Sequence, residues 1–488
     1  MRSIQPQQSA SRARIGRRLA LLAALLAIAV GAFIIVGDDG PLPRADVAVL
    51  DPDAESPFAY SDDRREALEQ RAAAGLSHVL YAKSPGGVVV SARRTARWRP
   101  LVEEVAEAEA LDPDVLEAIV LLESAGRPDA VADPELEGAV GLTQILAQTG
   151  VGLLDMRVEL RASRRLTRRI ARARAAGRAP RARRLEARRR RVDERFDPRA
   201  SLAATGRYLT FARGKLGRDD LAVVSYHMGV GNLGDVIEAF GEGAAPSYAE
   251  LFFDSTPTSH DAARRRLASL GDDSSTYYWR VLAAREIMRL SREEPDELER
   301  RAELQTAKAS AEELLHPESE TDVFADPDEL DDAYRDGDLW ALPNAPARTG
   351  LRRAPRMGEL APRLERGRAL YRGLRPEAYA LALMLARMVR EGGGGQAPLR
   401  MTSAVRDETY QSLLARGNPE ATEGYSLHTT GWAFDVARDY ASGAQAQAFQ
   451  FALDRLTALH LIAWVREPGA IHITVSEDAE QLLGLLEE

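Results

Sequence analysis

The first long apolar stretch of the chain runs from Leu19 to Val36 and contains no charged residue. Four arginines precede it, and Asp38 and Asp39 follow it. A run of this length is just sufficient to span a bilayer as a helix, and its positive flank should stay cytoplasmic. We therefore expect a cytoplasmic basic stub (1–18), a single-pass transmembrane anchor (19–36) and an extracytoplasmic remainder in the cell envelope. A cleaved signal peptide is the alternative.

Two other apolar patterns divide the rest of the chain. Over 96–291 the apolar residues recur mostly at helical spacing, as in 113–124, which has Pro113 near its start. Over 340–488 a helical segment is followed by short strand-like runs such as 470–475. These patterns predict a multidomain protein, with an all-α domain over 96–291 and an α+β domain over 340–488.

The segments between these patterns are polar. Residues 37–95 begin with a stretch rich in Pro, Asp and Ala, and we expect a tether and a short N-terminal extension there. Residues 293–338 hold 18 acidic against four basic residues, a net charge of −14, with few apolar positions. This composition is typical of a linker, so 292–339 is predicted to be an acidic linker or a partly ordered belt.

A basic block interrupts the helical region. Residues 157–195 contain 17 arginines and four acidic residues, a net charge of +13. Gly177 and Pro180 divide it into two halves, each with a thin apolar stripe, which predicts a helical hairpin inserted in the domain. Such a charge could bind an anionic wall polymer, and we take this as a hypothesis. Nucleic acid is not an expected partner behind an export segment. A solvated helical face is the alternative.

Composition narrows the chemistry. The chain has 488 residues, a net charge of −9 and 45% hydrophobic residues, which excludes wholesale disorder and a polytopic membrane protein. It contains no cysteine. Disulfides, thiolate zinc ligands and cysteine nucleophiles are therefore excluded, and any metal site must use His, Asp or Glu.

Glu123 is the first candidate catalytic residue. It ends a predicted helix that is apolar nearly all round, so its carboxyl group should be desolvated, and it faces the negative end of the helix dipole. Both effects favour the protonated acid and raise its pKa. A carboxylic acid that is neutral near pH 7 is what protonation of a glycosidic oxygen requires. The alternative is a glutamate that caps the helix or pairs with Arg127.

The sequence around Glu123 resembles a known family. Glu123-Ser124, Gly138-Ala-Val-Gly141-Leu-Thr-Gln144, Asp197-Pro198 and Ser225-Tyr226-His227-Met-Gly229 follow in order. They are similar to the E-S, G-L-M-Q, D-P and A-Y-N-x-G motifs of soluble lytic transglycosylases, which have a lysozyme-like fold. The resemblance covers about 96–291. It implies cleavage of the MurNAc-GlcNAc β-1,4 bond of peptidoglycan with formation of a 1,6-anhydro ring, without a cofactor in this domain.

The same resemblance assigns roles to single residues. Glu123 would act as the acid and then as the base. The residues that would line the glycan cleft and shape it are Ser124, Gly141, Gln144, Tyr226 and His227. Two of the matching positions depart from the family: Thr143 stands where Met is usual, and His227 where Asn is usual.

A second group of candidate residues lies near the C-terminus. His428, Asp435 and His472 form a set of two imidazoles and one carboxylate, which is a normal facial set for catalytic Zn²⁺. Gly431 and Ala433, within the run Ser426-Leu-His428-Thr-Thr-Gly-Trp-Ala-Phe-Asp435, are small and would let the backbone approach closely.

This run resembles the S-x-H-x-x-G-x-A-x-D motif of D-Ala-D-Ala carboxypeptidases and related peptidoglycan endopeptidases (the M15 type, VanY-like). Thr402-Ser403-Ala-Val-Arg406 and Tyr410-Gln411 are similar to a further segment of that family. The resemblance implies Zn²⁺ on His428, Asp435 and His472, an oxyanion-stabilising Arg406 and a general base at Glu467. The base usually lies three residues before the last His, but here it lies five before it. If the base is missing, the domain would bind stem peptides without cutting them.

Together these features predict a bifunctional, membrane-anchored enzyme that cuts the glycan strands of peptidoglycan and, with zinc, its stem peptides. Two alternatives remain open. One is a transglycosylase with a non-catalytic peptide-binding C-terminal module, and the other is a wall-binding scaffold.

Overall fold

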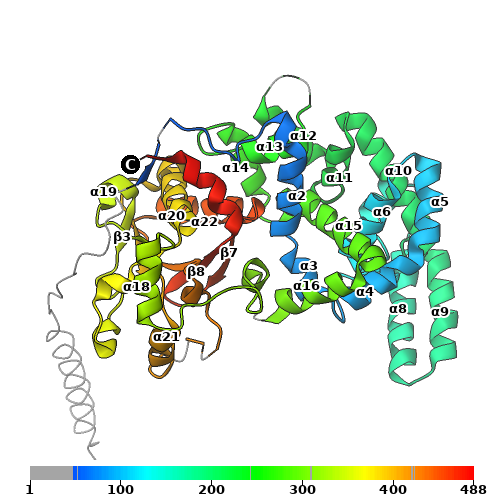
Figure 1. Ribbon diagram of the computed structural model, residues 1–488. Coiled ribbons are helices and arrows are strands. Elements are labelled where there is room, and N and C mark those ends of the chain that lie inside the picture. The colour runs from blue at the N-terminus through cyan, green and yellow to red at the C-terminus, as the bar shows by residue number, and fades with distance from the viewer. Residues whose placement is uncertain are drawn as a thin grey trace, which may run out of the picture.

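The computed structural model describes residues 48–487 except 52, 242, 244, 308–309, 419–420 and 423. These residues form a helical lobe and a second lobe built on a β-sheet, which share one large hydrophobic core (Figure 1). The predicted stub 1–18 and the predicted anchor 19–36 lie outside the described residues. Within the described ranges, no helix is both long and apolar enough to cross a membrane.

The helical lobe is organised around α6 (Pro113–Ser124), which packs against α15 (Tyr277–Glu293). The side chain of Asp112 caps α6 by accepting a hydrogen bond from the Asp114 N–H, and the helix ends where Ala125 turns to a φ of 52°. The described residues of 96–291 contain isolated β-bridges but no strand, so this lobe is all-α, as predicted. The surrounding helices are α5 (Arg99–Glu109), α7 (Ala147–Gly152), α10 (Pro198–Leu216), α11 (Asp219–Met228), α12 (Val230–Phe240), α13 (Tyr248–Asp254) and α14 (Asp261–Ser269).

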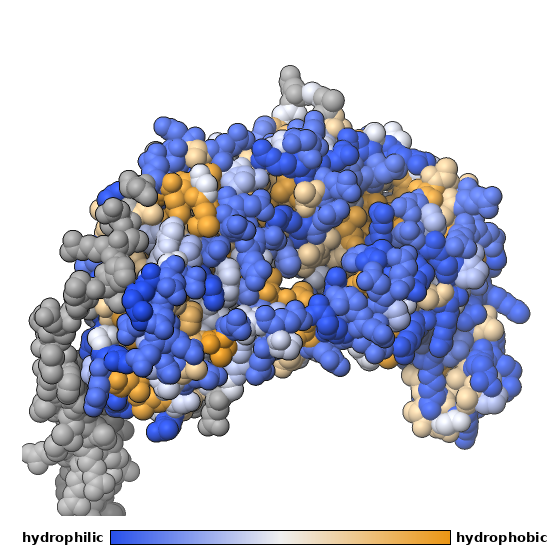
Figure 2. All heavy atoms as spheres, in the orientation of Figure 1, coloured by the Kyte–Doolittle hydropathy of each residue, from blue (hydrophilic) through white to orange (hydrophobic). Residues whose placement is uncertain are grey.

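The basic block forms a helical hairpin of α8 (Leu160–Ala175) and α9 (Ala179–Val192), which projects from the lobe (Figure 1). Its two helices pack through a small apolar cluster of their own that includes Leu166, Ile170 and Leu185. The thin apolar stripes of the sequence are therefore enough to join the two helices to each other. Figure 2 shows mostly hydrophilic side chains over the visible face of this projection, at the lower right of the view.

The tether and short N-terminal extension expected over 37–95 differ from the described structure, because the chain is helical over most of its length from residue 62 onward. Residues from 62 onward form α2 (Arg65–Gly75), α3 (His78–Lys83) and α4 (Val88–Thr95). Helix α2 contacts both α15 and α22 (Gly443–Ala458), so it lies between the two lobes (Figure 1). It buries Leu68 and Ala72. With so few large apolar residues, the sequence of α2 shows only a weak helical pattern. These residues are nevertheless enough to hold the helix in place, because both lobes cover them.

The predicted acidic linker or partly ordered belt, 292–339, connects the two lobes, but it is folded. It forms the end of α15, then α16 (Pro295–Ala307), α17 (Glu312–Leu315) and α18 (Pro327–Asp336). Much of its negative charge is neutralised by arginines, as where Arg289 pairs with Glu293 and Glu294. Its buried residues Glu312 and His316 are hydrogen-bonded to β8 of the sheet lobe. The acidic composition wrongly indicated an unfolded linker, because the arginines that pair with these acidic residues come partly from other segments of the chain.

The second lobe has a five-stranded sheet in the order β3-β5-β6-β8-β7, antiparallel except for the β3–β5 pair. Two small two-stranded sheets, β1–β9 and β2–β4, flank it, and β1–β9 joins the two ends of the described chain. The lobe is therefore α+β, as predicted. Its elements are β1 (Val49–Leu50), β2 (Trp340–Ala341), α19 (Pro346–Thr349), β3 (Leu351–Arg353), β4 (Gly373–Leu374), α20 (Pro376–Val389), β5 (Leu399–Ser403), α21 (Glu408–Ala415), β6 (Ala433–Ala437), α22, β7 (Ile462–Arg466), β8 (Ala470–Val475) and β9 (Leu486–Glu487).

Strand alternation separates the core of this lobe from its polar face. Phe434 and Val436 of β6, with Ile471 and Ile473 of β8, belong to the hydrophobic core that also contains residues of α20 and α22. The intervening residues point to the opposite face of the sheet. The polar residues of β6 and β8 are thereby gathered on one face.

Candidate active site and candidate metal centre

Glu123 lies in the last turn of α6, with its side chain half-buried. Burial raises the pKa of Glu123 to about 7, although a hydrogen bond from Tyr277 and the charge of Arg280 act in the opposite direction. The Tyr277 hydroxyl donates this bond to Glu123 Oε1 over 2.7 Å. The carboxyl group is therefore held in place by one donor and is close to half protonated at neutral pH.

Tyr277, the first residue of α15, is a site residue that the sequence motifs did not reveal. The ring of His227 stacks on the ring of Tyr277, with centroids 5.1 Å apart. The ring of Tyr226 also stacks on that of Tyr277, with centroids 6.4 Å apart. The His227 Nδ1 is hydrogen-bonded to Ser274 Oγ at 2.9 Å. The predicted residue His227 thus supports Tyr277, which in turn contacts the acid.

The loop after α6 is fastened to the helix end. Ser124 Oγ donates to the carbonyl of Leu142 over 2.7 Å. Gly141 has a φ of 84°, and a Cβ placed on it would lie 1.8 Å from the carbonyl oxygen of Arg195, so this position requires glycine. Gln144 has a φ of 52° and its Nε2 donates to the Gly141 carbonyl over 2.8 Å. These three predicted residues therefore shape the loop beside Glu123.

A buried cluster of hydroxyl groups explains the threonine at position 143. Thr143 Oγ1 lies 2.7 Å from Ser201 Oγ and accepts a hydrogen bond from Thr205 Oγ1 at 2.9 Å. The Tyr226 hydroxyl donates to the Thr143 carbonyl over 2.6 Å. Tyr226 is thus tied to the loop, and the hydrogen bond to Glu123 comes from Tyr277. Threonine here joins a polar network in which methionine could not take part.

The base of the arginine-rich hairpin is part of the same site. The buried Arg195 pairs with Asp193, with Nε to Oδ1 at 2.9 Å, and donates to the carbonyls of Leu136, Gly138 and Ile145. One guanidinium therefore satisfies three carbonyls of the loop next to Glu123. The base of the hairpin therefore supports the loop that borders the candidate cleft.

Gly141→Ala is expected to destabilise the helical lobe by about 3 kcal/mol, because the added methyl group would collide with the Arg195 carbonyl at a left-handed φ. Calorimetry should show a clearly lower midpoint of thermal unfolding. Gly152→Ala is the matched control, since a Cβ at Gly152 meets no atom within 4 Å. Equal midpoints for the two variants would contradict the packing described.

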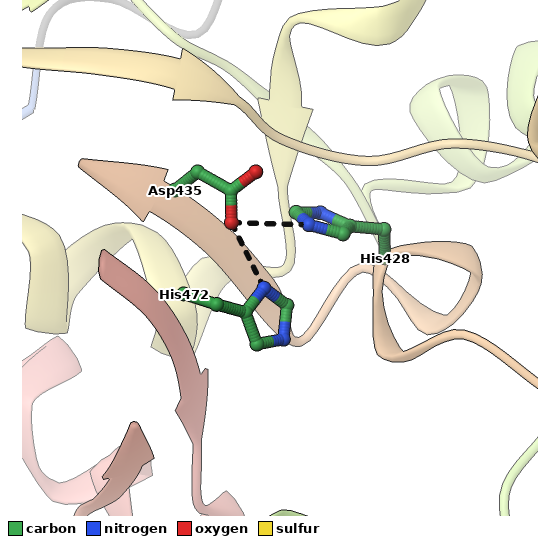
Figure 3. Close-up of side chains that lie close together, drawn as sticks. All are labelled: His428, Asp435 and His472. Carbon is green, nitrogen blue, oxygen red and sulfur yellow. Dashed lines mark hydrogen bonds and ion pairs between the residues drawn. The ribbon is translucent and has the colours of Figure 1, made fainter. Parts of the chain in front are cut away.

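The second candidate site brings His428, Asp435 and His472 together on the polar face of the sheet (Figure 3). His428 comes from η8 (Leu427–Thr430), Asp435 from β6 and His472 from β8, where Asp435 and His472 are directly paired across the strands. Asp435 Oδ1 lies 3.3 Å from His428 Nε2 and 2.9 Å from His472 Nδ1. One donor atom from each residue lies within 4.8 Å of the others.

The chemistry of these three side chains fits a zinc ion. His428 Nδ1 is 2.8 Å from the Ala404 carbonyl, to which it donates, so Nε2 is the nitrogen that faces the other two residues. Burial and the charge of Arg406 lower the pKa of His428 to about 4, which keeps this imidazole neutral, as a ligand must be. The pKa of Asp435 is held well below its ordinary value: burial opposes this, but His428 and His472 outweigh it.

His472 has a carboxylate on each side. Its Nδ1 faces Asp435, and its Nε2 lies 3.1 Å from Glu312 Oε1. Burial alone would lower the pKa of His472, but these two carboxylates raise it to about 10, so a metal ion must displace a proton from this ring in order to bind there. Glu312 is a second residue that the sequence did not reveal, because it belongs to the acidic segment and carries no motif. Only the fold shows that Glu312 lies next to His472.

Arg406 lies beside this group, with NH2 3.7 Å from Asp435 Oδ2, and donates to Gln411 Oε1 and Ser403 Oγ. Its burial lowers the pKa of the guanidinium, while the charges of Asp435 and Glu467, among others, act to raise it. Glu467 follows β7, two residues after Val465, which pairs with His472. Its N–H donates to the Ala470 carbonyl in the β7–β8 turn. Glu467 therefore lies just beyond the strand that pairs with His472, and its charge acts on Arg406.

Comparison with known proteins bears on the transglycosylase prediction. No protein-family model matches the chain. A segment of 69 residues is 36% identical to the endo-type membrane-bound lytic murein transglycosylase A of Citrobacter koseri, and covers 14% of this chain and 32% of that relative. The proteins of the same name from Salmonella paratyphi B and Salmonella paratyphi A are 35% identical with the same coverage. The chain thus matches about a third of the length of these relatives. This similarity supports a transglycosylase-like domain in the chain.

Proposed function

We propose that the helical lobe is a lytic transglycosylase that cleaves the MurNAc-GlcNAc β-1,4 bonds of peptidoglycan. The observation that carries the proposal is Glu123, a carboxyl group with a pKa of about 7 that is held by Tyr277 and is followed in the chain by Ser124, which is bonded to the loop of Gly141 and Gln144. The names of the similar proteins, which are murein transglycosylases, support the same reaction.

The reaction needs one carboxyl group in two protonation states. Protonated Glu123 gives its proton to the glycosidic oxygen as the bond to C1 breaks, which releases the neighbouring sugar with a free hydroxyl. The resulting carboxylate takes the proton of the C6 hydroxyl while O6 attacks C1, so the 1,6-anhydro ring closes and Glu123 is protonated again. A pKa near 7 suits both halves of this cycle.

We infer for the sheet lobe a zinc-dependent cleavage of stem peptides. His428, Asp435 and His472 would hold the ion, which supplies a Lewis acid for the scissile carbonyl and for water. Arg406, which lies beside Asp435, would donate hydrogen bonds to negative charge that develops on the carbonyl oxygen. Glu467 would take the proton of the attacking water. Zinc analysis and the peptide products of a digest test this part, and a domain that binds stem peptides without cutting them would yield no such products.

The two lobes would act on one polymer from fixed positions. Arg455 of α22 donates to the carbonyls of Phe252 and Ser255 in the helical lobe. Two sites on one chain raise each other's effective concentration on a shared substrate. We further propose that residues 19–36 anchor the enzyme to the membrane with both lobes outside the cytoplasm. The similar proteins are named as membrane-bound, which supports membrane association.

The hairpin is proposed to bind an anionic wall polymer. Among the described residues, all of its arginines without an ion pair are exposed except Arg189, which is buried and donates to Thr167. The exposed ones are Arg161, Arg165, Arg168, Arg169, Arg172, Arg178, Arg181, Arg183, Arg184, Arg188, Arg190 and Arg191.

Replacing four of these arginines with glutamine should weaken pelleting with isolated cell wall, and added salt should weaken the wild type in the same way, because both reduce the attraction to fixed anions. Substitution is preferable to deletion of 157–195, since Arg195 holds the loop beside Glu123. Unchanged pelleting would contradict the proposal. The substituted arginines are Arg168, Arg169, Arg183 and Arg184, and the control variant replaces the exposed Arg65, Arg97, Arg363 and Arg416.

A further inference from the structure

Glu312 is a buried carboxylate whose contacts converge on the candidate metal centre. It begins α17, and the residue is 6% exposed. Its Oε1 lies 3.1 Å from His472 Nε2 and accepts a hydrogen bond from Thr474 Oγ1 at 3.1 Å. Its Oε2 accepts from Ser310 Oγ at 2.7 Å. Both oxygens of Glu312 are therefore held by hydrogen bonds. Burying a carboxylate costs free energy unless it is paired and hydrogen-bonded, and these partners meet that requirement.

The two nitrogens of His472 have different surroundings. Nδ1 faces Asp435 Oδ1 at 2.9 Å, on the side where the donor atoms of the three residues gather, whereas Nε2 faces Glu312. A histidine that binds a metal through one nitrogen usually donates from the other to a carboxylate or a carbonyl, which fixes the ring and makes the ligand more basic. His428 has this arrangement with the Ala404 carbonyl.

We propose that Glu312 is a positioning residue for the metal centre, which orients His472 so that Nδ1 binds the ion and Nε2 donates to Glu312 Oε1. This inference rests on the proposed metal centre and adds a carboxylate from outside the peptidase-like region 340–488. Glu312 is not among the three residues whose donor atoms gather at the centre. Its role is therefore to hold a ligand and not to replace one.

The segment that carries Glu312 is clamped across the sheet lobe at further points. His316 Nε2 donates to the Val475 carbonyl over 2.6 Å, and the His316 ring stacks on Trp432 with centroids 4.8 Å apart. The Phe324 N–H donates to the Thr429 carbonyl next to His428. The metal centre is thus completed by the acidic segment that connects the two lobes, so ion binding by the sheet lobe depends on that segment being docked.

The test measures zinc affinity of the full chain by competition with a chromogenic chelator. Glu312→Ala is expected to raise the zinc Kd about 10- to 100-fold. Glu312→Gln keeps an oxygen acceptor without the charge and should raise it less. Glu318→Gln is the matched control, because this exposed glutamate lies in the same segment and its replacement removes the same charge. The visible absorption of the Co²⁺-loaded protein should change for Glu312→Ala and not for the control.

Several outcomes would overturn the proposal. A Kd for Glu312→Ala within about twofold of the wild type would show that Glu312 does not position His472. A loss as complete as that of His428→Ala would make Glu312 a direct ligand. If Glu312→Ala does not fold, as judged by circular dichroism, the proposal is tested with Glu312→Gln instead. A zinc Kd and a Co²⁺ spectrum equal to those of the wild type would then contradict it. Absence of zinc binding by the wild type would refute the metal centre itself, and this inference with it.

Discussion

Glu123→Gln is expected to lower the rate of glycan-strand cleavage about 100- to 10,000-fold, the range that a positioned general acid contributes. Glutamine keeps the shape of the side chain but cannot give a proton to the glycosidic oxygen. The rate is measured by the release of soluble muropeptides from purified peptidoglycan. Glu107→Gln, an exposed glutamate on α5, is the control and should cleave as the wild type does. A Glu123→Gln variant that retains more than about a tenth of the activity would refute the role of Glu123.

The pH dependence follows from the same carboxyl group. Glutamic acid is the form that begins the reaction, so kcat/KM should fall as the pH rises through the pKa of about 7. The hydrogen bond from Tyr277 favours the carboxylate and lowers the pKa of Glu123. Tyr277→Phe removes this bond, so the alkaline limb of the profile should move to higher pH even where the maximal rate decreases. If the alkaline limb moved to lower pH instead, the hydrogen bond from Tyr277 to Glu123 would be contradicted.

His428→Ala is expected to remove zinc from the sheet lobe. The wild type should carry about one equivalent after mild purification, and the variant well below half, because two of three protein ligands rarely retain the ion. The amount of metal is measured by elemental analysis. His260→Asn is the control, since His260 is exposed and asparagine tolerates its φ of 50°. Equal zinc contents in wild type and His428→Ala would refute the metal centre.

Much of the helical lobe could be predicted from local sequence. The helix 113–124 has Pro113 in its first turn and ends just before Gly126, and the structure gives α6 the same limits. The hairpin was also predictable, because each half has apolar residues at helical spacing and Gly177 lies between them. The limits of these elements depend on contacts within a few residues, which the sequence displays directly.

The remainder depends on contacts between distant segments. Tyr277 reaches Glu123 from 154 positions away, and Glu312 reaches Thr474 across 162, so no motif spacing could reveal either. The same applies to the two segments interpreted as tether and linker. Helix α2 is stable because both lobes cover its few apolar residues, and the acidic segment is folded because its charges are paired and Glu312 is bonded to the sheet lobe.

Two departures from the family motifs gain a physical account from the structure. Thr143 takes part in a buried hydroxyl network with Ser201 and Thr205 that also holds Tyr226. His227 stacks on Tyr277, the residue that donates to Glu123. Burial lowers the pKa of His227, so the ring is neutral at pH 7 and adds no positive charge that would favour ionisation of Glu123.

The central claim is that Glu123 directs ring closure on the substrate instead of the addition of water. Digestion of purified peptidoglycan by the wild type in ¹⁸O-labelled water, followed by mass spectrometry, tests it most directly. Ring closure takes its oxygen from the sugar, so the account predicts 1,6-anhydro muropeptides whose sugar carries no label, and none of them with Glu123→Gln. Reducing ends that carry ¹⁸O would show a hydrolase, and an undigested polymer would show a binding protein; either result would contradict the account.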